Sequence, residues 1–181
     1  ATYAALLAVG LPQKGIEVEL VKFSDVRHLP KLLRHYAYYR RVLMAARRAD
    51  LVLALDPVSV GLPAMCAARR ARKPFVTKIV GDYAWEQGRQ RFGVTQELDE
   101  FGRTRQKSFR VRLFQRVEIR VARSAARIIV PSHYLKSIVT AWGLLAEKIE
   151  IIYNAVPLED IGAVPAIVVE LPRPLVVSVG R

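Results

Sequence analysis

The sequence predicts an α/β fold in which a doubly wound parallel sheet is built from successive strand–helix units. Short apolar segments alternate along the chain with longer segments of helical periodicity. Residues 51–55 are apolar without interruption and end at Asp56-Pro57, which is typical of a strand buried on both faces. Right-handed crossovers then place the carboxyl ends of the strands at one edge of the sheet, where ligands bind in such domains.

The strands expected from apolar runs and alternation lie at residues 16–23, 51–55, 75–80, 127–130 and 148–153. The helices expected from three- and four-residue spacing lie at residues 2–9, 31–48, 63–72, 107–126 and 133–142. In the helix over 31–48 the apolar face is predicted to hold Leu32, Tyr36, Tyr39, Leu43 and Ala46. Residues 87–105 are polar and have no clear period, so no element is predicted there.

Composition favours one globular domain and excludes a disordered or fibrous chain, because 52% of the 181 residues are hydrophobic and 25% are charged. The net charge of +13 points to phosphates, nucleic acid or an anionic membrane as partners. Cys66 is the only cysteine, so no intrachain disulfide forms, which indicates a reducing, cytoplasmic compartment. No apolar run reaches the roughly 18–20 residues that a membrane-spanning helix needs.

The positive charge is concentrated in residues 27–48, which hold no acid, and in residues 103–127, which hold only Glu118. These segments are either solvated helix faces or a surface on which basic residues, with Tyr36, Tyr38 and Tyr39, meet anionic lipid. Nucleic-acid binding rests on charge alone, since no zinc-finger, RNA-recognition or basic-zipper signature is present. We therefore regard nucleic acid as the weaker partner.

Five segments at successive strand ends carry a family resemblance: residues 1–21, Gly81-Asp82-Tyr83-Ala84-Trp85-Glu86, and residues 129–132, 151–156 and 179–181. In this order they resemble the amino-terminal domain of GT-B glycosyltransferases of family 4, which pair two Rossmann-like domains. The resemblance implies a Rossmann-like acceptor-side domain over 1–156, a linker over 157–173 and the first strand of a truncated donor-binding domain over 174–181. It also implies a strand and a glycine pair before residue 2, so we expect the sequence to be cut at both ends and to lack an inner strand.

The resemblance further implies retaining transfer of a glycosyl group from a UDP- or GDP-sugar to a sugar or lipid-linked acceptor. It implies no further cofactor and no metal, and a fragment that is inactive without its carboxy-terminal domain. A lipid-linked acceptor would place the enzyme peripherally on the inner face of the membrane. The alternative is a non-catalytic basic module that binds anionic membrane or nucleic acid.

The segment 81–86 is the strongest candidate site, because it follows a predicted strand and combines two carboxylates with aromatic rings. By resemblance, Asp82 and Glu86 are the catalytic candidates that orient sugar hydroxyls, while Gly81, Tyr83 and Trp85 contact the acceptor. The alternative is a capped turn with Trp85 in the core. Many relatives carry histidine where this chain has Gly81.

The remaining candidates follow other predicted strands. Ser132 matches an acceptor-side position, but it also fits as the N-cap of the next helix. Asn154 matches a residue near the cleft, or it is a turn residue that ends a strand. Arg181 matches the arginine of a Gly-Arg motif that contacts the donor diphosphate, a task suited to a guanidinium. Glu118 is expected to form a structural ion pair.

Overall fold

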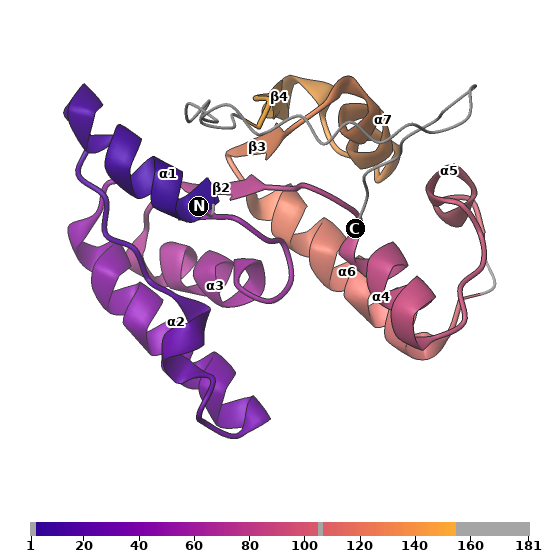
Figure 1. Cartoon of the computed structure of the whole chain (residues 1–181), viewed down its shortest axis with the longest axis horizontal. Coiled ribbons are helices and arrows are strands. Elements are labelled where there is room, and N and C mark those ends of the chain that lie inside the picture. Colours follow the sequence, from indigo (N-terminus) through magenta and orange to yellow (C-terminus); the bar gives the residue numbers. More distant parts are fainter. Residues whose placement is uncertain (1–2, 105–106, 155–181) are drawn as a thin grey trace, which may run out of the picture.

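The computed structural model describes residues 3–104 and 107–154, and it contains a parallel sheet of four strands. The strands are β1 (Val52–Ala54), β2 (Phe75–Lys78), β3 (Arg127–Val130) and β4 (Ile149–Ile151), and they lie side by side in sequence order (Figure 1). All three pairings are parallel, and each strand is only three or four residues long. The predicted parallel α/β sheet is therefore confirmed.

The α-helices of the described residues are α1 (Tyr3–Gly10), α2 (Lys31–Arg48), α3 (Gly61–Ala71), α4 (Tyr83–Arg91), α5 (Leu98–Phe101), α6 (Phe109–Ser124) and α7 (His133–Ala141). Short 3-10 turns, η1 (Pro12–Lys14), η2 (Phe23–Val26) and η3 (Ala146–Lys148), join some of them. Helix α5 and most of α4 lie where no element was predicted, and α4 begins within the candidate segment 81–86. None of the described helices is both long and apolar enough to cross a membrane.

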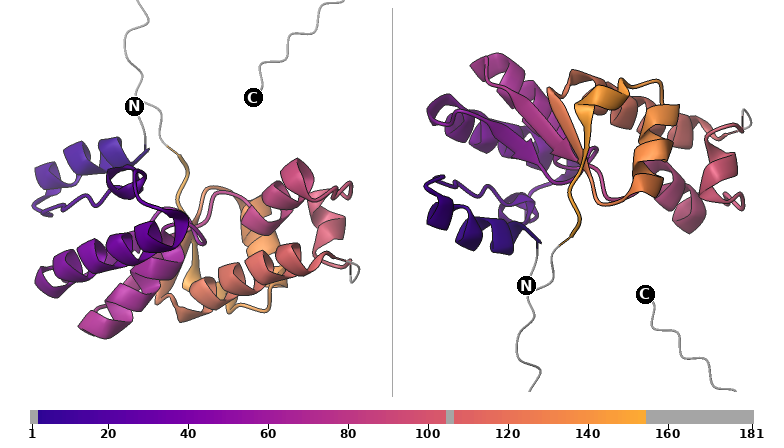
Figure 2. Two further views of the ribbon diagram at one scale, coloured as in Figure 1. Left: turned by 90° about the horizontal axis from the view of Figure 1, so that it is seen from below. Right: turned by 90° about the horizontal axis from the view of Figure 1, so that it is seen from above.

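Helices lie on both faces of the sheet, as a doubly wound fold requires. Phe75 of β2 joins the main core with α3 and α6, whereas the Nζ of Lys78 lies 3.5 Å from the ring centroid of Tyr3 in α1. Side chains alternate between the two faces along a strand, so Phe75 and Lys78, three positions apart, point to opposite faces of the sheet. Helix α1 therefore lies on the other face of the sheet from α3 and α6. Figure 2 shows α1 as a separate layer beside the rest of the chain.

Residues 16–22 do not form the strand that their alternation predicts. They are extended, but a strand needs a ladder of hydrogen bonds to a neighbour, and among the described residues β1 pairs only with β2. A hollow of about 1110 Å³ separates this segment from β1 and is lined by Val18, Leu20 and Leu53. Leu53 is 37% exposed, so β1 is not buried on both faces as expected. The hollow lies where an additional inner strand would pair with β1.

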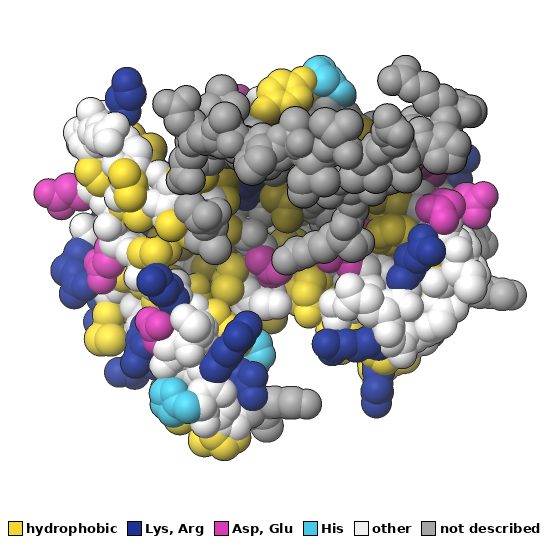
Figure 3. All heavy atoms as spheres, viewed as in Figure 1, with side chains coloured by type: hydrophobic (Ala, Val, Ile, Leu, Met, Phe, Trp, Pro, Cys, Tyr) yellow, Lys and Arg dark blue, Asp and Glu magenta, His cyan; other side chains and the backbone are white. Residues whose placement is uncertain are grey.

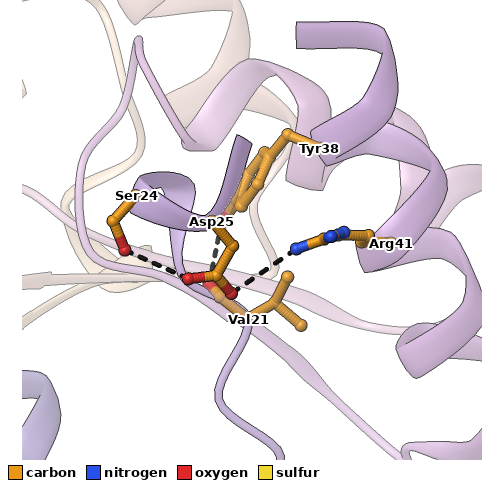
Figure 4. A network of polar contacts seen from close by, with 5 residues as sticks. All are labelled: Val21, Ser24, Asp25, Tyr38 and Arg41. Atoms are coloured by element: carbon orange, nitrogen blue, oxygen red, sulfur yellow. Dashed lines mark hydrogen bonds and ion pairs between the residues drawn. The ribbon is translucent and has the colours of Figure 1, made fainter. Parts of the chain in front are cut away.

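Helix α2 is amphipathic as predicted, and its buried face matches the expected one in part. Leu43 and Ala46 are buried as expected, but the buried face also includes Tyr38 and Val42, and Tyr36 is 60% exposed. Tyr38 donates a hydrogen bond from its hydroxyl to the carbonyl of Val21 at 3.3 Å (Figure 4). Burial, assisted by the negative charges of Asp56 and Asp25, raises the pKa of Tyr38 to about 12. Tyr38 therefore packs inward and is not available to lipid.

Part of the basic face of α2 is also neutralised within the protein. Arg41 pairs with Asp25 at 3.6 Å, and Arg48 pairs with Glu19 at 2.8 Å. Figure 3 shows that Lys and Arg side chains gather on the left over α2 and on the right over α4 and α6. The structure therefore has a basic surface, but α2 contributes fewer unpaired cations to it than its count of Lys and Arg residues indicates.

Candidate functional site: carboxylates around the start of helix α4

The carboxyl end of β2 leads directly into α4, and Asp82 is the N-cap of that helix. Its backbone is extended, and its Oδ1 accepts a hydrogen bond from the N–H of Trp85 at 2.8 Å. An N-cap carboxylate satisfies a backbone donor that the helix leaves unpaired and lies at the positive end of its dipole. Only 2% of Asp82 is exposed, so the residue predicted to be catalytic holds the helix in place.

Glu118 of α6 completes the cap from the neighbouring helix. It is fully buried, and its Oε1 and Oε2 accept hydrogen bonds from the N–H groups of Tyr83 at 2.9 Å and Ala84 at 3.3 Å. Among the described residues no ion pair includes Glu118, so the expected structural ion pair was wrong. The carboxylate instead accepts from two backbone donors, which explains why it is buried without a cation.

The pKa values of both buried carboxyl groups are raised, and the charge of Asp82 contributes to the shift of Glu118. Burial raises the pKa of Asp82. The hydrogen bond from Trp85 and the positive charge of Lys107 lower this pKa, but burial has the larger effect. Burial, and then the negative charge of Asp82, raise the pKa of Glu118 well above the usual glutamate value. Desolvation also lowers the pKa of Lys107. The pair therefore keeps a proton at pH values where an exposed carboxylic acid has lost it.

Glu86 is the exposed carboxylate of the cluster, and it lies over Gly81. A Cβ atom at Gly81 would collide with the Oε1 of Glu86. Partial burial raises the pKa of Glu86, and the charge of Asp56 adds to the effect. The space that a side chain at residue 81 would fill therefore belongs to the Glu86 carboxylate.

Asp56 is a member of the site that the sequence analysis missed. It follows β1, and its Oδ1 accepts from the N–H groups of Val58 at 2.7 Å and Ser59 at 2.5 Å. Its negative charge contributes to the raised pKa of both Glu86 and Glu118. The signal was available, because an acid directly after a buried strand lies at the ligand-binding edge of the sheet.

Trp85 and Tyr83 are only half buried. The indole Nε1 of Trp85 donates to the carbonyl of Gln96 at 2.9 Å, and its ring packs on a small core with Phe101. The ring of Tyr83 meets Phe114 edge-on, with centroids 5.5 Å apart. The first turn of α4 therefore holds both rings at the rim of the site, so the capped-turn alternative describes the local structure and stacking on an acceptor stays a prediction.

The other predicted residues follow β3 and β4 at the same edge of the sheet. Ser132 is the N-cap of α7, and its Oγ accepts from the N–H of Leu135 at 3.1 Å, which confirms its capping role. Asn154 follows β4 and is exposed. Arg181, the linker over 157–173 and the strand over 174–181 lie outside the described residues.

Lys78 is a second residue that the sequence analysis missed. It is 1% exposed at the end of β2, and its Nζ has no hydrogen-bond partner among the described residues. The hydroxyl of Thr77 is likewise buried without a partner. A lysine inside an apolar strand was the available signal, because buried charges are rare without compensation.

The arrangement can orient hydroxyl groups through Glu86 and can hold a proton on the buried pair. In the described part of the chain, no group of three or more His, Cys, Asp or Glu residues is arranged to hold a metal ion. The chemistry that the described residues offer is therefore that of carboxylates at a helix N-terminus.

The family described as "Glycosyl transferase 4-like domain" matches residues 1–155. No curated protein matches the chain. Among solved structures, HepE from Anabaena in complex with UDP has a TM-score of 0.50 and 20% identity, covering 81% of this chain and 33% of that one. Its complex with UDP and glucose has a TM-score of 0.52 and 18% identity, covering 86% and 35%. At such identities the likeness shows the fold alone, and this chain spans about a third of HepE.

Proposed function

The chain belongs to the glycosyl transferase 4-like domain family, and on that premise we propose that it forms the acceptor-side half of a retaining glycosyltransferase. The observation that carries the proposal is that Asp82, Glu86 and Glu118 lie together at the start of α4, where the charge of Asp56 also acts on Glu86 and Glu118. These carboxylates come from three separate parts of the chain and meet at the carboxyl edge of the sheet. This is the edge at which open α/β domains bind their ligands.

A uridine diphosphate sugar is the donor that we propose. The HepE structures contain UDP, UDP with glucose, or UDP-glucose, which supports a uridine over a guanosine nucleotide. In this proposal a carboxy-terminal domain makes most of the contacts to the donor. Residues 157–173 are the linker to that domain, and residues 174–181 are its first strand. Arg181 would then contact the diphosphate of the donor.

In the proposed reaction the acceptor oxygen bonds to the anomeric carbon while the bond from that carbon to the diphosphate oxygen breaks. The acceptor proton passes to the leaving diphosphate, so no strong side-chain base is needed. Glu86 accepts a hydrogen bond from an acceptor hydroxyl beside the reacting one and so orients the acceptor, because it is the exposed carboxylate of the cluster. Asp82 and Glu118 are positioning residues that hold the helix carrying Glu86.

The Glu86 carboxylate also supplies negative charge near the reacting sugar, where relatives place a histidine.

We propose a sugar or lipid-linked acceptor, and a peripheral position on the inner, cytoplasmic face of the membrane. The exposed basic residues of α2, such as Arg40 and Arg47, support contact with an anionic surface. The occupant of that surface is separate from the chemistry at Glu86.

The test is Glu86→Gln in the full-length protein, with UDP release from UDP-glucose and product formation as readouts. We expect kcat to fall by about 10²-fold or more, because one aligned polar group in the transition state is lost. The melting temperature should stay the same, since Glu86 is exposed.

Glu100→Gln is the matched control, because this exposed glutamate lies on α5 away from the cluster. It should leave turnover unchanged. Equal turnover of wild type and Glu86→Gln would contradict the proposed role. Absence of any transfer by the wild type with sugar nucleotides would favour the non-catalytic basic module.

A further inference from the structure

A second hollow lies at the edge of the sheet opposite to the carboxylate cluster. It has a volume of about 570 Å³ and is formed where strands begin, at Phe75 of β2, Ala126 before β3 and Lys148 before β4. The carboxylate cluster lies where β1 and β2 end. The two sites are therefore at opposite edges of one sheet, and the proposed sugar transfer does not use this hollow.

Every charged residue that lines the hollow is basic. These residues are Arg69, Lys73, Arg120, Arg123 and Lys148. None of the five side chains has an ion pair or hydrogen bond within residues 3–104 and 107–154. Of the two acids nearest to Lys148 in sequence, Glu147 is exposed and forms no ion pair among the described residues, and Glu150 pairs with Arg127 at 3.4 Å. The hollow therefore gathers positive charge that the described protein does not neutralise.

The floor of the hollow is apolar, since Met65, Phe75 and Ala125 are all buried. Charges beside an apolar floor are screened less than charges that face water on all sides, so their mutual repulsion and their attraction for an anion are both increased. Arg69 and Arg123 lie in the last turns of α3 and α6, where the negative end of the helix dipole stabilises a positive charge. The helix dipoles do not account for the positions of Lys73 and Arg120, which lie outside those last turns.

We propose that this hollow binds a phosphate-bearing anion. Three guanidinium groups provide planar pairs of N–H donors that match phosphate oxygens, and the two ammonium groups add point charges. A volume of about 570 Å³ is within the usual range of small-ligand sites. The phosphate belongs either to a lipid headgroup or to a soluble phosphate compound, and the experiment separates these sources.

The first arm measures binding of inorganic pyrophosphate to the full-length protein by calorimetry. Arg120→Gln/Arg123→Gln removes two cations of the hollow, and Arg112→Gln/Arg116→Gln removes two exposed cations from the same helix outside it. We expect the first pair to weaken binding about tenfold or more and the second pair to weaken it less than about threefold. Both pairs lower the net charge equally, so a diffuse electrostatic effect would weaken binding equally.

The second arm uses vesicles of phosphatidylglycerol with phosphatidylcholine, and vesicles of phosphatidylcholine alone. A lipid headgroup as ligand predicts binding only to the anionic vesicles, with the same difference between the two variant pairs. Pyrophosphate binding without vesicle binding assigns the hollow to a soluble phosphate compound. Equal losses in the two variant pairs, or no binding of either probe by the wild type, overturn the proposal.

Discussion

Glu86 and Gly81 share one small volume, and this pairing defines the site at the scale of single residues. The absence of a side chain at residue 81 lets the Glu86 carboxylate lie against the backbone. Asp82 and Glu118 are buried beneath it and have raised pKa values, mainly because of desolvation. The exposed carboxylate therefore meets the ligand in our proposal, and the buried pair keeps it in place.

Gly81→Ala tests this shared volume, because the new Cβ would displace the Glu86 carboxylate. We expect transfer by the full-length protein to fall about 10–100-fold, as a displaced orienting group loses its alignment. In a protein that already carries Glu86→Ala, Gly81→Ala should not lower the transfer activity further. A double-mutant cycle on kcat/KM measures this coupling, and additive losses would contradict it.

The buried pair predicts how stability depends on pH. A carboxyl group with a raised pKa binds more protons in the folded than in the unfolded chain, so stability falls as pH rises above about 4.5, the usual glutamate value. Glu118→Gln removes this titration and should flatten the decline. Urea unfolding at pH 5 and pH 8 measures the two slopes. An identical decline in wild type and variant would show that Glu118 does not titrate in this range.

At the scale of elements, three of the described helices begin with a side-chain cap. Asp82, Ser108 and Ser132 accept from the backbone N–H three residues on, at the starts of α4, α6 and α7. Two of these caps, Asp82 and Ser132, follow strands of the sheet. The fold therefore places helix N-termini, with their partial positive charge, along the edge where the proposed ligand binds.

Ser132→Ala separates the capping role from an acceptor-binding role. Loss of the cap should cost about 1 kcal/mol of the free energy of unfolding, measured by urea denaturation. Ser132→Asp keeps a capping oxygen and should restore that stability. If Ser132→Asp also restores transfer, the hydroxyl has no separate role at the acceptor. Transfer that stays low in a stable Ser132→Asp protein would support direct contact with the acceptor.

At the scale of the whole molecule, the described residues form one sheet with unequal edges. The edge beyond β1 opens into a hollow of about 1110 Å³, and the carboxyl edge carries the acids of the candidate site. The amino edge carries the basic hollow of about 570 Å³. Charge of opposite sign is thus separated across the sheet, in a chain whose net charge is +13.

The isolated 181-residue chain should not transfer sugar. The chain covers only 33% of HepE, and in our proposal the donor contacts lie in a further domain. UDP release from UDP-glucose should therefore be undetectable for this chain and measurable for the full-length protein with a suitable acceptor. Circular dichroism of both proteins controls for folding. Turnover by the isolated chain would refute the proposed division of labour between two domains.

The sequence by itself determined the order of the four strands and of helices α1, α2, α3, α6 and α7, the parallel sheet and the family, because periodicity and motif order are local properties of the chain. It also predicted that the segment 81–86, with Asp82 and Glu86, is the centre of the candidate site, and the site stays a prediction. It could not identify the partners of that segment. Glu118 contacts the backbone of Tyr83 across 35 positions, and Asp56 approaches Glu86 from another strand.

Only the tertiary structure decided which residues are buried and what they contact. It showed that residues 16–22 lack a strand partner, that Tyr38 packs inward, and that Lys78 is buried without a hydrogen-bond partner among the described residues. Burial and hydrogen bonding depend on segments that meet only after folding. The same alternation of residues is therefore compatible with a paired strand or with an extended segment beside a hollow, and packing selects between them.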